Sequence, residues 1–150
     1  MRVRQVERAD EAVWRELFRG YRDFYALAPD EAVVDRVWSW LHDDDSELHG
    51  LVVEVDGVVV ALTHHRAFLR PTNGTVGTYL DDLFVAPESR GRGAARALID
   101  HLGAAAVRDG RSVVRWITAA EDNAAARGLY DTLADATHWV TYDLETPSGR

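Results

Sequence analysis

The chain has 150 residues, no cysteine, and 17 Lys plus Arg against 25 Asp plus Glu, for a formal net charge of −8 at pH 7. This length is typical of one soluble domain with its own core, so we expect a single domain over residues 1–150. The missing cysteines exclude a disulfide framework and a cysteine nucleophile, and the negative charge disfavours a nucleic-acid partner and favours cationic or neutral substrates.

The first half of the chain predicts one strand, two helices and a β-hairpin. In chain order these are a strand at residues 3–6, a helix that Asp10 caps, a helix that follows Pro29-Asp30 and ends at Asp43-Asp44-Asp45, and strands at 51–55 and 58–62. Val13, Leu17 and Tyr21 recur at helical spacing. Asp56-Gly57 between two β-branched runs is a strong signal for a hairpin turn.

The second half predicts an alternation of strands and helices. It gives a strand at residues 75–85, a helix from about Gly93 to Val107, strands at 113–117 and 139–144, and a helix at 123–133 between them. The whole order is β-α-α-β-β-β-α-β-α-β. Hairpins followed by a β-α-β unit favour a mixed sheet with helices on both faces.

The sequence contains no signal for secretion or membrane insertion. Residues 1–11 alternate in charge and lack an apolar core, and the longest apolar stretch, residues 58–62, is too short to span a bilayer. We therefore expect a cytoplasmic protein with no membrane partner.

A glycine-punctuated turn joins the strand at 75–85 to the next helix. Arg90, Arg92 and Arg96 concentrate positive charge around Gly91 and Gly93. Helix-start amides and flexible backbone favour an anionic ligand here. The spacing fits neither a dinucleotide fingerprint nor a nucleoside-triphosphate loop. Taken alone, the loop is explained equally well as a helix start with solvated arginines.

Two motifs resemble those of a known family. Arg90-x-x-Gly93-x-Ala95 matches the Q/R-x-x-G-x-G/A signature of the GNAT acyltransferase superfamily, and residues 123–130 match its N-x-x-A-x-x-L/F-Y pattern. The resemblance implies a GNAT-like α/β (α+β) fold. Such a fold has a mixed, mostly antiparallel central sheet flanked by helices and splayed between the fourth and fifth strands.

The resemblance also implies an acetyl-CoA-dependent N-acetyltransferase that releases coenzyme A and uses no metal. The residues implied in cofactor binding are Leu83, Phe84, Val85, Arg90, Gly91, Arg92, Gly93, Ala94, Ala95, Asn123 and Tyr130. A backbone N–H near Leu83 or Val85 would stabilise the tetrahedral oxyanion. Many relatives are dimers, and an apolar strand at 139–144 would expose a long edge, so we expect a homodimer.

Tyr130 corresponds to the family tyrosine near the cofactor sulfur, which implies a general acid for the departing thiolate. Without the motif, core packing is the better interpretation of this residue. Two features depart from the family. Asp131-Thr132-Leu133 replaces the usual x-x-x-G-F continuation, and Thr118 stands where some members carry a glutamate base.

The strand at residues 79–85 is similar to that of spermidine/spermine N-acetyltransferase-like members, which carry an acidic pair at the positions of Asp81 and Asp82. A carboxylate beside the acceptor can hold the ammonium and receive its proton, so Asp81 and Asp82 are candidate substrate-binding residues. Adjacent strand residues face opposite ways unless a bulge intervenes, so we expect one carboxylate in the cleft and favour Asp81 as the catalytic group. An exposed and a loop-capping carboxylate would explain the pair without function. By the same alternation, at most one of His64 and His65 lies near the cleft.

The acceptor pocket of this family is built by the first two helices, which carry Trp14, Tyr21, Tyr25, Trp38 and Trp40. Most of them belong to the core, while one or two, such as Tyr25, would line an aromatic wall against an amine. We therefore expect acetyl transfer to a small primary amine, polyamine-like or amino-acid-like, by direct attack in a ternary complex. The alternatives are a non-catalytic acyl-CoA sensor or interaction module and a protein amine acetyltransferase.

Overall fold

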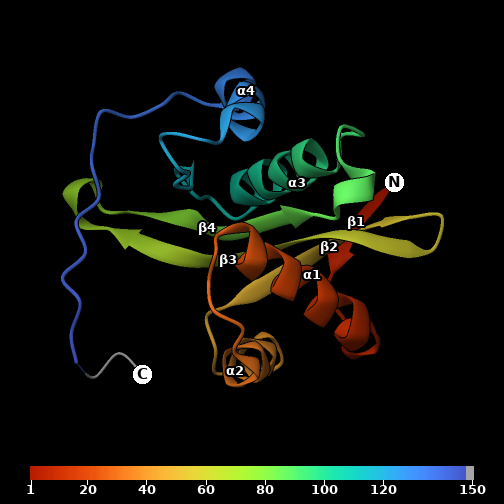
Figure 1. The fold of residues 1–150 in the computed structure, drawn as a ribbon. Coiled ribbons are helices and arrows are strands. Elements are labelled where there is room, and N and C mark those ends of the chain that lie inside the picture. The colour runs from red at the N-terminus through yellow and green to blue at the C-terminus, as the bar shows by residue number, and fades with distance from the viewer. Residues whose placement is uncertain (148–150) are drawn as a thin grey trace. The chain divides into compact units, whose positions relative to one another are not determined.

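The computed structural model describes residues 1–147. These residues fall into two compact units, Met1–Ile117 and Thr118–Arg150, the second of which is described as far as Pro147. The larger unit contains the sheet and three helices, and the smaller one contains a single helix (Figure 1).

The larger unit is built on a five-stranded sheet in the order β1-β2-β3-β4-β5. Its strands are β1 (Arg2–Gln5), β2 (His49–Val55), β3 (Val58–Arg70), β4 (Thr75–Val85) and β5 (Val114–Arg115). All neighbours are antiparallel except β4 and β5, which run parallel. The expected mixed, mostly antiparallel sheet is confirmed.

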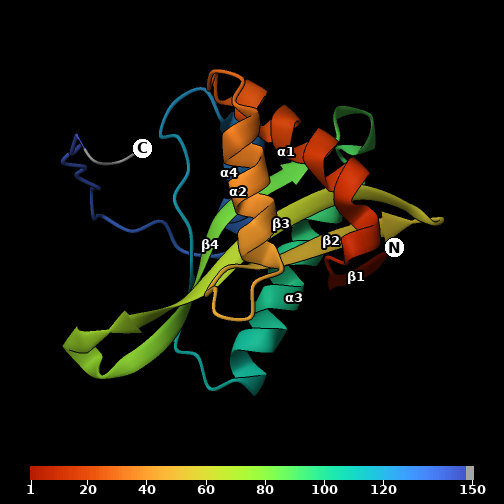
Figure 2. The same ribbon diagram turned by 90° about the horizontal axis from the view of Figure 1, so that it is seen from below.

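Helices cover both faces of this sheet. Helices α1 (Glu11–Phe24) and α2 (Glu31–Leu41) lie on one face and α3 (Ala94–Arg108) lies on the other (Figures 1 and 2). Helix α2 begins where predicted, because the Asp30 carboxylate accepts hydrogen bonds from the first-turn amides of Ala32 and Val33.

The main core lies between α1, α2 and the sheet. Trp14 is its largest fully buried side chain, with ring centroids 5.1 Å from Phe18 and 5.0 Å from Trp38. Leu17, Val34, Val52, Leu62 and Phe84 complete the contact surface. Burial of such large apolar side chains is the main driving force for this packing, and it fixes α1 over β3 and β4.

The Asp56-Gly57 hairpin is confirmed. Both turn residues have left-handed backbone angles, with φ values of 50° and 80°. This is the conformation that a two-residue turn needs to match the twist of the flanking strands. β3 continues to Arg70, eight residues beyond the predicted end at Leu62, and pairs with β4 along its extension.

Strand β4 carries a β-bulge at its acidic pair. His64 pairs with Asp82 and His65 pairs with Leu80, so Asp81 is the extra residue without a direct partner on β3. A bulge breaks the alternation of side chains between the two faces of a sheet. Consecutive residues at this point can therefore point toward the same side.

The sheet separates between β4 and β5. Only Thr78 and Tyr79 of β4 pair with β5, opposite Val114 and Arg115. β5 is therefore shorter than the predicted strand at 113–117, and the pairing stops before the bulge. This agrees with the expected splay between the fourth and fifth strands.

The smaller unit contains α4 (Ala124–Leu133), which confirms the predicted helix. The predicted strand at 139–144 is wrong, because residues 134–147 form no helix or strand. Trp139, Val140, Tyr142 and Leu144 are 73–91% exposed. An apolar pattern becomes a strand only where a neighbouring strand completes the hydrogen-bonded ladder, and the pattern itself does not supply that neighbour.

A buried ion pair ties β1 to the start of α1. The two terminal guanidinium nitrogens of Arg4, Nη1 and Nη2, donate to the two Asp10 carboxylate oxygens at 2.7 and 2.9 Å. The Glu7 amide donates to Asp10 Oδ2 at 2.8 Å. Asp10 was expected to cap the helix through its side chain. It occupies the capping position, but its carboxylate is used by Arg4 and Glu7 instead.

We predict that Asp10→Ala lowers the free energy of unfolding by about 3 kcal/mol, because Arg4 loses a buried partner and keeps only Glu54. The hydrogen bond from Arg4 outweighs burial and lowers the pKa of Asp10. The ion pair therefore contributes its full share to the free energy of unfolding above the ordinary carboxyl pKa. This contribution is lost as the pH falls through the lowered pKa of Asp10. Urea denaturation at pH 7 and pH 3 measures both effects. Asp35→Ala, which removes an exposed partner of Arg15, is the control and should change stability little.

Candidate active site

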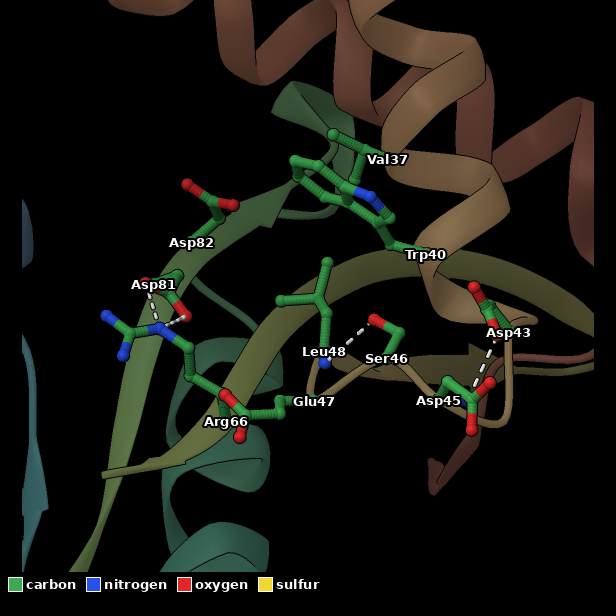
Figure 3. Close-up of a pocket in the computed structure, with 10 residues that line it drawn as sticks. All are labelled: Val37, Trp40, Asp43, Asp45, Ser46, Glu47, Leu48, Arg66, Asp81 and Asp82. Atoms are coloured by element: carbon green, nitrogen blue, oxygen red, sulfur yellow. Dashed lines mark hydrogen bonds and ion pairs between the residues drawn. The ribbon is translucent and has the colours of Figure 1, made fainter. Parts of the chain in front are cut away.

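A pocket of about 620 Å³ opens in the larger unit beside the acidic pair. It lies between the end of α2, the loop from α2 to β2, and strands β3 and β4 (Figure 3). Its lining consists of Val37, Trp40, Asp43, Asp45, Ser46, Glu47, Leu48, Arg66, Asp81 and Asp82. Five of these side chains are carboxylates and one is a guanidinium, so the pocket favours a cationic ligand.

Both carboxylates of the pair line this pocket. Only one of them was expected there unless a bulge intervened, and the bulge at Asp81 does interrupt the alternation of the strand. Figure 3 shows Asp81 beside Arg66 and Asp82 turned away from it. The carboxylates of Asp81 and Asp82 therefore have different partners within one pocket.

Asp81 is paired with Arg66. The guanidinium Nε lies 3.2 Å from Asp81 Oδ2, and the guanidinium also covers the Tyr79 ring at 4.9 Å from its centroid. Burial nevertheless raises the pKa of Asp81 above its ordinary value, and the nearby Asp82 adds to the rise, while Arg66 opposes it. Asp81 is thus the more basic carboxylate of the two.

Asp82 contacts the buried His64. Its Oδ2 lies 2.8 Å from His64 Nδ1, and the Trp14 indole N–H donates to His64 Nε2 at 3.1 Å. Burial alone would raise the pKa of Asp82, but the hydrogen bonds with His64 and Tyr21 outweigh it and lower the pKa. His64 lies on the α1 face and His65 lines a separate cavity against α3, so the two histidines face opposite ways as expected.

Aromatic residues flank the acidic pair. The rings of Tyr21 and Tyr25 lie 5.0 Å apart, and the charge of Asp82 helps burial to raise the pKa of both hydroxyls. Tyr25, which was expected to contact substrate, therefore lies near Asp82. Trp40 lines the pocket and is 46% exposed, whereas Trp14 and Trp38 belong to the core.

The glycine turn before α3 has the geometry of an anion site. Gly91 and Gly93 have φ values of 72° and 88°, in the left-handed region that favours glycine. Gly93 caps α3 without a side chain, and the first turn of the helix contains no acidic residue. The first-turn amides of such a helix have no acceptor within the helix itself, so they can bind an anion.

Arg90 is turned back toward β4 rather than along the helix. Its Nε donates to the Val85 carbonyl at 3.1 Å, and its guanidinium lies 5.4 Å from the centroid of the Phe84 ring. This contact orders the turn between β4 and α3. It also shows that the Val85 carbonyl points away from β3.

The backbone of Leu83 and Val85 faces the open side of β4. The Ala86 amide donates to Val60 on β3, and the Asp82 carbonyl accepts from Thr63, so even-numbered residues point toward β3 here. Strand alternation then turns the amides of Leu83 and Val85 toward the edge where the β5 ladder has ended. These residues are among those that the family resemblance implies in cofactor binding.

Asn123 and Tyr130 lie in the smaller unit, where each is described by itself. Asn123 precedes α4 as its capping residue, but its side-chain amide donates to Thr118 Oγ1 at 2.6 Å instead of capping the helix. Tyr130 is half-buried on α4, and its carbonyl accepts from the Ala134 amide. Their assignment to cofactor binding and catalysis stays a prediction.

Sequence reasoning missed the acidic loop and the arginine of the pocket. Asp43, Asp45 and Glu47 were interpreted only as the end of a helix, although four acidic residues within residues 43–47 are an obvious charge signal. The sequence did not indicate a role for Arg66, because the strand predicted at residues 58–62 ends before it. Within residues 1–147, no cluster of three or more His, Asp or Glu side chains is arranged to hold a metal ion, and no helix is long and apolar enough to cross a membrane.

Comparisons with known proteins agree with this geometry. The model of the acetyltransferase (GNAT) family matches residues 12–134. N-acetyltransferase YhfO of Bacillus subtilis is 31% identical over 157 residues, covering 99% of each chain. D-amino-acid N-acetyltransferase HPA3 of Saccharomyces cerevisiae is 27% identical over 142 residues, covering 93% of this chain and 88% of that protein.

A solved structure shows the same fold at lower identity. AAC(6')-Iy, in complex with the bisubstrate analog CoA-S-monomethyl-acetylneamine, has a TM-score of 0.76 at 20% identity, with 97% of each chain covered. The splayed sheet, the glycine turn before α3 and the family match over most of the chain have one explanation: the chain belongs to the GNAT family and is an acyltransferase.

Proposed function

We propose that the protein transfers an acetyl group from acetyl-CoA to a small primary amine that carries a second positive charge. The observation that carries this proposal is the pocket beside the splayed strand, where five carboxylates face one guanidinium. Aromatic side chains near the same carboxylates add favourable contacts to a cation. A polyamine-like acceptor, as in the spermidine/spermine-like members, fits this charge.

Acetyl-CoA would bind across the glycine turn and the open edge of β4. The amides at the start of α3, with Arg92 nearby in the turn, would hold the pyrophosphate. The amides of Leu83 and Val85 would bind the pantetheine arm and the developing oxyanion. Asn123 and Tyr130 complete the proposed cofactor residues on the basis of the family motif.

The proposed reaction is a direct attack in a ternary complex. The neutral amine nitrogen forms a bond to the thioester carbonyl carbon, and the carbon–sulfur bond then breaks. An alkylammonium of pKa about 10.4 costs roughly 4.6 kcal/mol to deprotonate at pH 7, so a proton acceptor is needed. Asp81, as the more basic carboxylate, takes the amine proton directly or through water, and Tyr130 protonates the departing thiolate.

The names of the relatives define the alternatives within this chemistry. HPA3 is named for D-amino acids, and the AAC(6')-Iy complex holds an analog that joins CoA to an aminated sugar. An amino acid would bring its own carboxylate into a pocket with five of them. Charge repulsion therefore favours the diamine over the amino acid as the acceptor.

We also propose that the protein is a cytoplasmic homodimer. The exposed apolar side chains of Trp139, Val140, Tyr142 and Leu144 support association, because a soluble protein gains free energy by covering such a surface.

We predict that 1,4-diaminobutane is acetylated with a kcat/KM at least about tenfold above that of 4-amino-1-butanol, because only the diamine keeps a second ammonium in the acidic pocket. Release of free thiol from acetyl-CoA measures both rates. D-Alanine and lysine-containing peptides complete the panel. Equal rates for the two matched amines would contradict the diamine proposal. Binding of acetyl-CoA without thiol release for any acceptor would indicate a non-catalytic sensor.

We predict that Gly93→Val weakens acetyl-CoA binding at least tenfold, equivalent to about 1.4 kcal/mol. A branched side chain at a φ of 88° must shift the backbone whose amides would contact the pyrophosphate. Gly110→Val is a matched control, because Gly110 has a φ of 66°, follows the other end of α3, and also has open space around its Cα. Calorimetric titration that shows equal affinity loss in both variants would reject the site.

We predict that Tyr130→Phe and Asp81→Asn impair the enzyme in different ways. Loss of the hydroxyl should lower kcat roughly 10- to 1000-fold with acetyl-CoA affinity almost unchanged. Loss of the Asp81 carboxylate should lower activity most at neutral pH, with recovery as rising pH supplies free amine. Steady-state rates between about pH 6 and 10 separate the two. Wild-type turnover in Tyr130→Phe would exclude it as the acid.

A further inference from the structure

The three side chains of Trp14, His64 and Asp82 form a chain of hydrogen bonds that ends in the acidic pocket. His64 is fully buried between α1 and the sheet, at 1% exposure. Trp14 Nε1 is 3.1 Å from His64 Nε2, and His64 Nδ1 is 2.8 Å from Asp82 Oδ2. The edge of the His64 ring also contacts Phe18, with centroids 5.2 Å apart.

The order of donors in this chain is fixed by Trp14. An indole N–H can only donate, so His64 Nε2 must carry a lone pair. The proton of the neutral imidazole is therefore on Nδ1, from which it is donated to Asp82. A second proton on His64 would have to enter at Nε2, which would leave two buried donors facing each other. The hydrogen bonds at both ring nitrogens thus fix the orientation of the His64 ring.

This arrangement holds the Asp82 carboxylate in one orientation at the pocket. His64 Nδ1 contacts Oδ2, and Asp82 lines the pocket beside Asp81. Arg66 on β3 is paired with Asp81. Tyr21 on α1 and Tyr25 directly after this helix have raised pKa values, so their hydroxyls stay uncharged.

We propose that Asp82 is the specificity-determining anion that holds the second ammonium of the acceptor, and that Trp14 and His64 are positioning residues that hold its carboxylate in place. This inference rests on the proposed function, because it assigns the group that recognises the cationic part of the substrate. It divides the acidic pair into a cation-binding Asp82 and a proton-accepting Asp81.

The first test is the order of hydrogen bonds around His64 in the full-length protein, measured by ¹⁵N NMR of the histidine side chains. The expected result is a proton on Nδ1 and a hydrogen bond from the Trp14 indole to Nε2. A wild-type His64 that carries a proton on Nε2 would overturn the proposal.

The second test is calorimetric binding of 1,4-diaminobutane, which does not depend on turnover. Asp82→Asn should weaken binding at least about tenfold. Trp14→Phe should also weaken binding, because His64 loses the indole donor that orients its ring. Trp38→Phe removes the same ring volume from the same core cluster and keeps the hydrogen bond from Trp14 to His64, so its binding should stay close to that of the wild type.

His64 itself is tested by a pair of substitutions. His64→Asn keeps an N–H near the position of Nδ1 and should restore binding relative to His64→Leu, which has no donor. If His64→Leu fails to fold, the wild-type NMR result and the Asp82→Asn titration still show whether the proposal is correct.

The outcomes separate this inference from the proposed function. Diaminobutane that binds with the expected dependence on Asp82 and Trp14, but is not acetylated, would support this inference and reject only the proposed acceptor. If diaminobutane is acetylated but Asp82→Asn and Trp14→Phe leave its binding unchanged, this inference is rejected and the proposed reaction is still supported.

Discussion

The active-site region depends on one irregularity in a hydrogen-bonded ladder. A regular β4 would send Asp81 and Asp82 to opposite faces of the sheet, one toward α1 and α2 and the other toward α3. The extra residue at Asp81 removes this alternation, and both carboxylates then line the same pocket. On the partner strand, His64 and His65 keep facing opposite ways, so one of them can contact Asp82 from the α1 side.

Two adjacent carboxylates in one pocket are stable only because they have different partners. Like charges this close repel, and the protein reduces this cost by pairing Asp81 with a guanidinium and Asp82 with His64 and Tyr21. The result is a pair of chemically identical side chains with unequal basicity. Two regions of the chain also differ in local charge. The pocket is acidic and the turn before α3 is rich in arginine, although the net charge of the whole chain is negative.

Most elements could be predicted because their signals are local. Asp30 caps α2 through its own side chain, Asp56-Gly57 makes the hairpin turn, and the glycine turn before α3 is visible as spacing. The sequence allowed for a bulge at the acidic pair but did not place it, because its position depends on how β3 meets β4. The wrong predictions depended on partners outside the local pattern. The strand predicted at 139–144 needed a neighbour, and the carboxylate of Asp10 is used by Arg4. The acidic loop was visible as composition, but its place in the pocket was not.

The short ladder between β4 and β5 has a consequence for the behaviour of the protein in concentrated solution. An unpaired strand edge is a template on which another chain can add a strand, and this is a common start of aggregation. The parallel pairing ends at Tyr79, so the backbone at Leu83 and Val85 faces such an edge. Arg90 lies over this end of the strand, where it occupies the Val85 carbonyl and brings a positive charge. This arginine is therefore placed to hinder another strand from docking at the open edge.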